Sequence, residues 1–258
     1  MSDNKEFFEL LKSVANEQTF ALELSPGKEP STVACRQLTT NQLKQIIKSV
    51  VDSPLTQFSF NTACTNVFKQ SLVILPIQPL NVLDRLLFLI QTRIYSLSPI
   101  TTLNINGNDI KVDFKEILSK LSQKIKDNRS ILGLTTATED QITIGFGIAL
   151  LEAEHQLNEE LYKDFNPDTN NLEELRSLLG ETFIHEIAKT VQTITIGEKT
   201  LNLSTISFKN RIEAIESLPA SLIQKVIEYI EKYKEIVNEC LTVDGHLITL
   251  DASLFSVR

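Results

Sequence analysis

Apolar residues recur every three to four positions along much of the chain, which is the spacing of an amphipathic helix. Thr40 is a favoured N-cap residue ahead of one such run, and Asn81 with Asp84 forms a capping-box-like start to another. Gly180 lies inside a third run, which therefore forms either one bent helix or two short ones. The spacing predicts helices at residues 4–14, 40–53, from 61 onward, 81–94, 114–126, from 149 onward, 172–191 and 219–237.

Other segments alternate apolar and polar residues on either side of a turn, which is the pattern of a β-hairpin. An isolated two-stranded hairpin is marginally stable in water. Each hairpin is therefore expected to pack on helices, pair with another hairpin or pair with a partner chain. The alternation predicts hairpins at residues 102–113, 193–203 and 241–250, and strands at 19–24, 35–38 and 141–148.

Together these patterns predict a mainly α fold with small β-hairpins, an α+β class in which short antiparallel hairpins punctuate helical units. The 258 residues are enough for one large domain or two small ones. Three segments are expected: an N-terminal strand-turn plus helical unit at 1–99, a hairpin, basic helix and strand-helix segment at 100–165, and a C-terminal helical unit with two hairpins at 166–258.

The composition is that of an ordinary globular protein, with 42% hydrophobic residues and a formal net charge of −8. It excludes a disordered or collagen-like chain and gives no general attraction to nucleic acid or to anionic membranes. The most apolar window, residues 71–90, is interrupted by Pro76, Pro79, Asp84 and Arg85, so no membrane insertion is expected. Because the start shows no signal-peptide pattern, we expect a chain made and kept in the cytoplasm.

The charge is unevenly distributed along the chain. Residues 1–130 carry 15 basic and 12 acidic side chains, whereas residues 131–258 carry 10 basic and 21 acidic ones. Complementary charge steers the docking of proteins, so the two parts are expected to meet different neighbours.

The main basic element is the helix predicted at 114–126. Glu116 and Asp127 are interspersed among its lysines, and interleaved aromatic residues are lacking, which favours a solvated helix face over a site for a polyanion. Lys115, Lys120 and Lys124 are therefore candidate contacts for a partner protein rather than for nucleic acid.

Motifs for metal or nucleotide chemistry are incomplete in this sequence. His185–Glu186 begins like a zinc-protease helix, but Lys189 stands where the second histidine ligand is required. Gly145 and Gly147 lack the third glycine of a dinucleotide-binding loop, so a bulge or close backbone packing is expected there. No P-loop sequence occurs.

Single reactive residues are no better placed for catalysis. Cys35, Cys64 and Cys240 are too few and too widely spaced for a disulfide framework and are expected to be small core residues. His155 and His246 are expected at exposed positions. We therefore predict no catalytic, metal-binding or cofactor-binding residues, while an active site assembled from distant residues stays an open alternative.

The last fifty residues, from Ser207–Phe208 through Ser217–Leu218–Pro219 to the hairpin at Gly245 and the closing Phe255, carry a family resemblance. They resemble the ending of the baseplate hub subunit or hub-assembly protein family of T-even-type contractile-tailed phages. The N-terminal part is also similar, and the middle matches only in outline. The positions that carry the resemblance, and that it implies to be fold-determining, are Asp84, Arg85, Arg93, Phe208, Arg211, Leu218, Pro219, Gly245 and Phe255.

One departure from the family concerns the terminal hairpin. Relatives often carry paired cysteines there, which suggests a bound metal, whereas this chain has only Cys240 before the hairpin. A metal is therefore not carried over to this chain. Folding of the hairpin is expected to come from packing of Leu241, Val243, Leu247, Leu250 and Phe255.

The resemblance implies a non-enzymatic part in tail assembly. The chain would be a structural subunit or assembly factor of the central baseplate hub, with other baseplate or tail proteins as partners and an oligomeric arrangement within the assembly. It would be found in the virion tail baseplate and, during assembly, in the host cytoplasm. Two alternatives stay open: a transient chaperone absent from the mature virion, and a cytoplasmic binding module or undetected enzyme.

Overall fold

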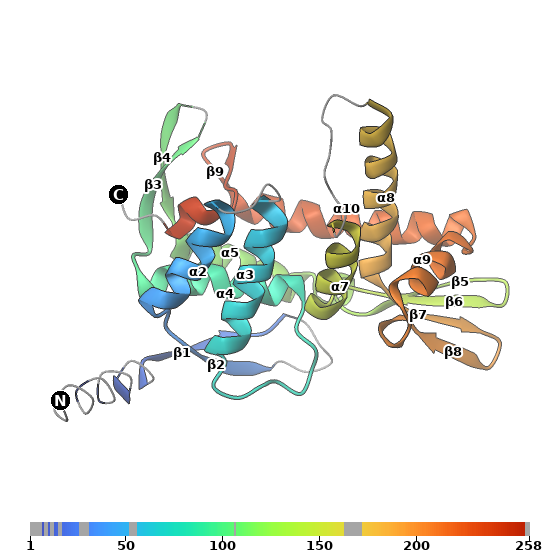
Figure 1. Ribbon diagram of the computed structural model, residues 1–258, viewed down its shortest axis with the longest axis horizontal. Coiled ribbons are helices and arrows are strands. Elements are labelled where there is room, and N and C mark those ends of the chain that lie inside the picture. Colours follow the sequence, from blue (N-terminus) through green and yellow to red (C-terminus); the bar gives the residue numbers. More distant parts are fainter. Residues whose placement is uncertain are drawn as a thin grey trace. The chain divides into compact units, whose positions relative to one another are not determined.

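The computed structural model describes residues 7, 10, 13–14, 17–25, 31–51, 56–105, 107–162 and 172–255. Most of the helix predicted at 4–14 and the end of the helix predicted at 40–53 lie outside these residues. Helices make up most of the described secondary structure, and the strands form short antiparallel pairings (Figure 1). The predicted α+β class is confirmed.

Two compact units make up the chain. The first takes residues 1–78, 83–127 and 237–258, and the second takes residues 79–82 and 128–236. Each unit thus combines segments that are distant in sequence, and helix α10 (Ala220–Leu241) contributes residues to both. The predicted division into three consecutive segments follows chain order and stays a prediction.

In its described residues, the first unit contains helices, three antiparallel strand pairs and a short terminal 3-10 turn. The pairs are β1 with β2, β3 with β4, and β9 with β10. Besides the end of α10, its elements are β1 (Thr19–Glu23), β2 (Thr32–Arg36), α2 (Thr40–Val51), α3 (Thr56–Ser71), α4 (Val82–Ser96), β3 (Ile100–Ile105), β4 (Asn108–Asp113), α5 (Phe114–Asp127), β9 (Thr242–Val243), β10 (His246–Leu247) and η2 (Ala252–Phe255).

Aromatic rings occupy the core of the first unit. Phe88 of α4 stacks on Phe68 of α3 with ring centroids 4.6 Å apart, and on Phe20 of β1 at 6.4 Å. β1 alternates the buried Phe20 and Leu22 with exposed neighbours, as a half-buried strand must. Buried residues lie on every side of α4, which is the pattern of a central helix.

The predicted start of α2 is wrong by one residue. Thr39 is the capping residue, because its Oγ1 accepts a hydrogen bond from the Gln42 N–H at 3.3 Å. The Thr39 N–H donates in turn to Gln42 Oε1 at 3.0 Å, which completes a capping box. Thr40 is then the first helical residue, since only one of two adjacent threonines can take the cap.

Two further details of the prediction are wrong in this unit. α3 begins at Thr56 rather than Asn61, because Phe60 is buried and extends the apolar stripe of the helix toward its N-terminus. Leu247 of the terminal hairpin is exposed, and Ile248 is buried in its place. The Ile248 N–H donates to the Leu241 carbonyl oxygen at 2.9 Å, which turns the chain back onto the end of α10.

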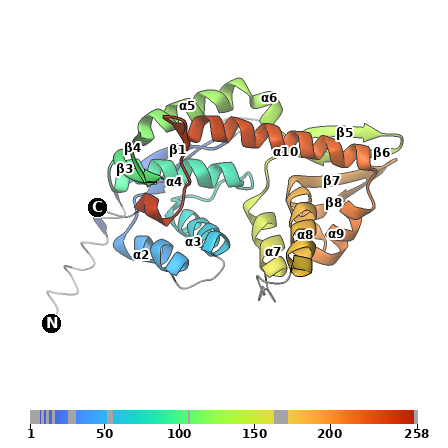
Figure 2. The same cartoon turned by 90° about the horizontal axis from the view of Figure 1, so that it is seen from above.

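The second unit is built on one antiparallel sheet with strand order β5-β6-β7-β8. Helices α7, α8 and α9 pack together beside it (Figure 2). The predicted run at 172–191 forms one helix, α8. Besides most of α10, the elements are α6 (Arg129–Leu132), β5 (Thr135–Glu139), β6 (Ile142–Phe146), α7 (Leu151–Tyr162), α8 (Leu172–Thr190), β7 (Val191–Ile196), β8 (Lys199–Asn202), η1 (Leu203–Thr205) and α9 (Phe208–Glu216).

The apolar face of this sheet meets α10. Phe146 of β6 contacts Tyr229 of α10 edge to face, with ring centroids 5.5 Å apart. The Tyr229 hydroxyl donates to the Leu132 carbonyl oxygen at 3.3 Å, so its polar end also has a partner. Burial raises the pKa of Tyr229 above its usual range. The sheet is therefore held by a helix that begins after Pro219, far along the chain.

The opposite face of the sheet carries a row of threonines. Thr138, Thr143, Thr195 and Thr200 lie side by side across the four strands. The Oγ1 atoms of Thr138 and Thr143 lie 2.9 Å apart, as do those of Thr195 and Thr200. We call these four residues the threonine row.

Gly145 of β6 lies next to the threonine row and permits close packing. A Cβ atom at this position would lie 2.4 Å from Thr193 Oγ1 of β7. The register between β6 and β7 also shifts between Gly145 and Phe146. The expected bulge or close backbone packing at this glycine is thus confirmed.

Candidate functional site

The loop between α3 and α4 exposes a cluster of aliphatic side chains. Relative exposure is 40% for Val73, 77% for Ile74, 71% for Leu75 and 106% for Ile77. Pro76 interrupts the run and fixes the backbone angle φ at its position. We call residues 73–77 the apolar loop. The sequence pattern placed this segment in an apolar window and did not predict its exposure.

Backbone contacts hold the start of the apolar loop. At its start, Leu72 forms a bridge with Cys35, and the Val73 N–H donates to the Ala34 carbonyl oxygen at 2.9 Å. Residues 79–82, which follow the loop, belong to the second unit, where Asn81 forms a bridge with Leu150. The start of the apolar loop is therefore held by strand β2 of the first unit, and the loop leads into the second unit.

The apolar loop also lies in an uncharged stretch of chain. No Asp, Glu, Lys or Arg occurs from Gln70 to Leu83, and the nearest charged residues in sequence are Lys69 and Asp84. Asp84 is buried, and Lys69 is exposed. The signal in the sequence is an uncharged aliphatic run interrupted by Pro76 and Pro79, and the structure adds that its side chains are exposed.

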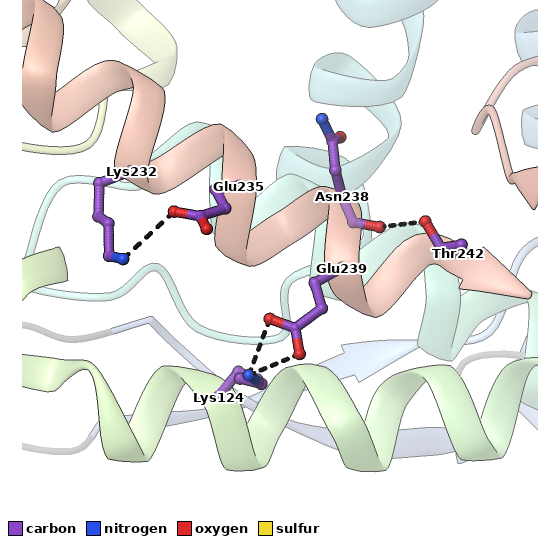
Figure 3. A network of polar contacts seen from close by, with 6 residues as sticks. All are labelled: Lys124, Lys232, Glu235, Asn238, Glu239 and Thr242. Carbon is purple, nitrogen blue, oxygen red and sulfur yellow. Dashed lines mark hydrogen bonds and ion pairs between the residues drawn. The ribbon is translucent and has the colours of Figure 1, made fainter. Parts of the chain in front are cut away.

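The three lysines proposed as partner contacts lie on α5 and differ in their surroundings. Lys124 forms an ion pair with Glu239 of α10, with Nζ 2.7 Å from Oε1 (Figure 3). The hydrogen bond to Glu239 is the main reason that the pKa of Lys124 is raised. Lys115 and Lys120 are exposed. Lys124 therefore has a structural partner within the first unit, and the other two face solvent.

Three of the family positions are buried in α4. Asp84 Oδ1 accepts a hydrogen bond from the Ser25 N–H at 2.7 Å. Arg85 Nη1 donates to Thr65 Oγ1 of α3 at 3.0 Å. Arg93 is also buried, and its Nε has no hydrogen-bond partner among the described residues. Burial lowers the pKa of Arg93. In the described contacts, Asp84 and Arg85 link α4 to distant segments of the first unit.

Arg211 of α9 is the most extensively bonded of the family positions in the described contacts. Its Nε and Nη2 both donate to the Ala188 carbonyl oxygen, at 2.9 and 2.5 Å. Nη2 also donates to the Val191 carbonyl oxygen at 3.1 Å, and Nη1 to that of Leu203 at 3.5 Å. Burial lowers the pKa of Arg211 to about 10, so the guanidinium stays charged at neutral pH.

The remaining family positions lie at contacts and chain turns. The ring of Phe208 meets that of His185 with centroids 5.1 Å apart, and Phe255 is buried.

The turn positions lie around the start of α10 and in the terminal hairpin. The Pro219 carbonyl oxygen accepts from the N–H groups of the first turn of α10. Leu218 precedes it, and its N–H donates to the Ile215 carbonyl oxygen at 3.1 Å. Gly245 has φ +79°, a conformation that suits glycine in a two-residue hairpin turn.

The three cysteines are buried, and the histidines outside α8 are half-buried. Cys35, Cys64 and Cys240 are all buried, as predicted for core residues. Burial raises the pKa of Cys35 and of Cys64 to about 12, which makes poor nucleophiles of both. His155 and His246 are half-buried rather than fully exposed. Within the described part of the chain, no group of three or more His, Cys, Asp or Glu residues is arranged to hold a metal ion.

The described helices include none that is long and apolar enough to cross a membrane. Comparison with protein families, with curated proteins and with solved structures finds no match to this chain. The candidate site is therefore assigned from its own geometry. The apolar loop is the candidate contact site, because three of its neighbouring aliphatic side chains are each more than two-thirds exposed.

Proposed function

We propose that this chain is a non-enzymatic tail protein of a contractile-tailed phage, a structural subunit or assembly factor of the central baseplate hub. It acts by contact with hub, tube-initiation or tape-measure proteins. The observation that carries this proposal is the exposure of the apolar loop, residues 73–77. The sequence resemblance at the C-terminal end supplies the assignment to the hub.

Exposed aliphatic side chains favour a contact function on energetic grounds. Burying one such side chain completely stabilises a complex by roughly 1.5–3 kcal/mol. Ile74, Leu75 and Ile77 are each more than two-thirds exposed and close together in sequence, so one pocket could cover all three. A small group of buried anchors supplies most of the affinity at protein interfaces.

The charges near the loop favour a protein over a lipid surface as the partner. Membrane-binding segments combine apolar side chains with Lys and Arg residues that attract anionic lipid. Here the stretch from Gln70 to Leu83 carries no such residue. An apolar, uncharged pocket on another tail protein is the complement that this loop fits best.

Affinity capture from infected-cell lysate tests the proposal. The tagged wild-type chain is expected to retain baseplate or tail proteins, and a variant with Ile74→Ser and Leu75→Ser is expected to lose them. Leu247→Ser is the matched control, because Leu247 is also an exposed aliphatic residue of the first unit. Unchanged capture by the loop variant would remove the loop from the contact. A chain that binds a metabolite and no tail protein would support the binding-module alternative.

Mass spectrometry of purified particles separates the two forms of the proposal. A structural subunit is expected in mature virions at a fixed ratio to other baseplate proteins. A transient chaperone is expected in assembly intermediates and absent from mature virions. Absence from both preparations would contradict the assignment to the tail.

A further inference from the structure

β5 leaves one edge of the second unit's sheet open. Among the described residues it pairs with β6 and with no other strand, and it carries no proline. Its residues, Thr135 to Glu139, include one charged side chain at the very end. Open edges in soluble proteins are usually protected by charge, proline or bulges, and β5 has little of this protection.

The opposite edge, β8, is protected in the usual way. β8 has four residues, begins with Lys199 and follows Glu198 in the turn. It ends at Asn202, where the chain enters η1. β5 also has one charged residue at its turn end, Glu139, so the two edges differ in length and in the kind of charge, and lysine in particular discourages pairing. β5 is one residue longer and carries no lysine, which makes it the better template for another strand.

The hairpin turn fixes which backbone groups of β5 face outward. Asp140 and Gln141 form a two-residue turn, so the flanking pair Glu139 and Ile142 exchanges backbone hydrogen bonds. Hydrogen-bonded and non-hydrogen-bonded pairs alternate along an antiparallel ladder, so Ala137 and Thr135 also point their backbone groups toward β6.

Thr136 and Thr138 then direct their N–H and C=O groups to the open side. The 2.9 Å distance between Thr138 Oγ1 and Thr143 Oγ1 agrees, because side chains approach most closely in the non-hydrogen-bonded pairs. β5 thus offers two outward donors and two outward acceptors, with one residue between them.

We propose that β5 pairs antiparallel with β5 of a second copy of this chain about a twofold axis at Ala137. Thr136 of each copy then exchanges two backbone hydrogen bonds with Thr138 of the other, four in all. Glu139 lies opposite Thr135 of the second copy, so no like charges face each other. The sheets of the two copies join into one, and a threonine-lined face continues across the junction.

A second copy of β5 satisfies every outward backbone group of this strand at the register centred on Ala137. The outward N–H and C=O groups of Thr136 and Thr138 are symmetric about Ala137. A copy of β5 related by a twofold axis at Ala137 therefore bonds all of them. The pairing does not depend on a hub partner or on the apolar loop. It is a small contact, so a dissociation constant in the micromolar to millimolar range is expected.

Sedimentation of the full chain from about 1 µM to about 1 mM tests the pairing. Wild-type protein is expected to shift from monomer to dimer within that range. Thr138→Pro removes two of the four intersubunit hydrogen bonds and none to β6, so it should weaken the dimer roughly tenfold to a hundredfold.

Thr200→Pro is the matched control. Thr200 Oγ1 lies 2.9 Å from Thr195 Oγ1, as Thr138 Oγ1 does from Thr143 Oγ1. The turn between β7 and β8 also has two residues, so the Thr200 N–H points away from β7, on the open side of β8. Thr200→Pro should leave the dimer unchanged. A wild-type chain that stays monomeric throughout, or equal effects of the two prolines, would overturn the proposal.

A cysteine at the proposed axis gives a test that does not depend on proline. In a non-hydrogen-bonded pair the two Cα atoms lie about 4.5 Å apart, which a disulfide can bridge. Ala137→Cys is expected to cross-link under mild oxidation, and Thr200→Cys is not. The three native cysteines are buried and provide a low background. If Ala137→Cys does not cross-link at concentrations where the dimer forms, the dimer contact lies elsewhere. If Ala137→Cys cross-links to another protein instead, that protein and not a second copy is the partner of β5.

Discussion

Arg211 of α9 holds the carbonyl oxygen of Ala188 at the end of α8 through two of its nitrogens at once. The last carbonyl groups of a helix have no partner within the helix. The same guanidinium also reaches Val191 at the start of β7 and Leu203 at the start of η1. One side chain thus satisfies backbone groups where a helix, a strand and a 3-10 turn meet.

We expect Arg211→Met to lower the free energy of unfolding by about 3–5 kcal/mol. Methionine fills similar space but leaves three buried carbonyl groups without this donor. Urea unfolding followed by circular dichroism measures the change. Lys209→Met is the control, because Lys209 is exposed on the same helix and its replacement should change stability by less than about 0.5 kcal/mol. Equal stabilities of the two variants would show that the arginine contacts are not needed for the fold.

The fold class was predictable because helix and hairpin patterns are local. The structural role of Arg211 was not, since its partners at Ala188, Val191 and Leu203 become neighbours only when α8, β7 and α9 pack. β5 was missed for a different reason. Its sequence, Thr-Thr-Ala-Thr-Glu, offers one aliphatic side chain, so pairing with β6 rather than apolar alternation makes it a strand.

The helix predicted at 219–237 has more apolar residues than α10 buries. Ile223, Ile230 and Val237 are half-buried, whereas Tyr229, Ile236 and Cys240 are buried. Apolar residues lie on more than half of this helix, so the neighbouring elements decide which of them become core. The apolar loop was missed for the same reason, because hydrophobicity shows which residues gain from burial and not whether the chain buries them.

Stability is expected to fall below about pH 6.5 because of His185. Burial is the main cause that lowers the pKa of His185, and Lys189 lowers it further, while Glu181 and Glu186 raise it. The unfolded chain, with an ordinary histidine pKa near 6.5, therefore binds the proton more readily than the folded chain. Stability is fully present above that pH and is lost as the pH falls toward the pKa of the folded state.

Urea unfolding at intervals from about pH 7.5 to about pH 5 measures this dependence. His185→Gln removes the titrating ring and should flatten the curve in this range, although the lost contact with Phe208 lowers stability at every pH. His155→Gln is the control, since His155 lies at a partly exposed position beside Glu159. A wild-type stability that rises toward acid pH would contradict a lowered pKa of His185 in the folded chain.

Charge reversal at Lys115 and Lys120 tests the basic side of α5 as a contact surface. Both side chains are exposed, so Lys115→Glu with Lys120→Glu should leave the thermal unfolding midpoint almost unchanged. Capture of a tail partner is expected to weaken, and more so at low salt, because screening reduces the contribution of surface charges. Intact capture at low salt would remove these lysines from the contact.

Lys124 needs separate treatment because it already has a partner. Lys124→Glu places a like charge opposite Glu239 and is expected to lower the unfolding midpoint at low salt (Figure 3). Adding Glu239→Lys restores an opposite pair and should recover the midpoint. If the double variant regains the unfolding midpoint but not partner capture, Lys124 contributes to the ion pair and also to the partner contact. If it regains the midpoint and the capture, Lys124 acts through the ion pair with Glu239 alone.

Gly145→Ala is expected to destabilise the second unit by about 1–3 kcal/mol. The new methyl group would lie 2.4 Å from Thr193 Oγ1, so the strands must separate or the threonine must turn away. Thr193→Ala removes that oxygen and should recover most of the loss, because the next atom, Thr193 Cβ, is at an ordinary contact distance of 3.8 Å. Thermal unfolding of the two single variants and the double variant gives the coupling between the positions. If the effects of the two single variants simply add, Gly145 is required for its backbone freedom. If the coupling recovers nearly all of the stability lost in Gly145→Ala, Gly145 is required for the space it leaves to Thr193.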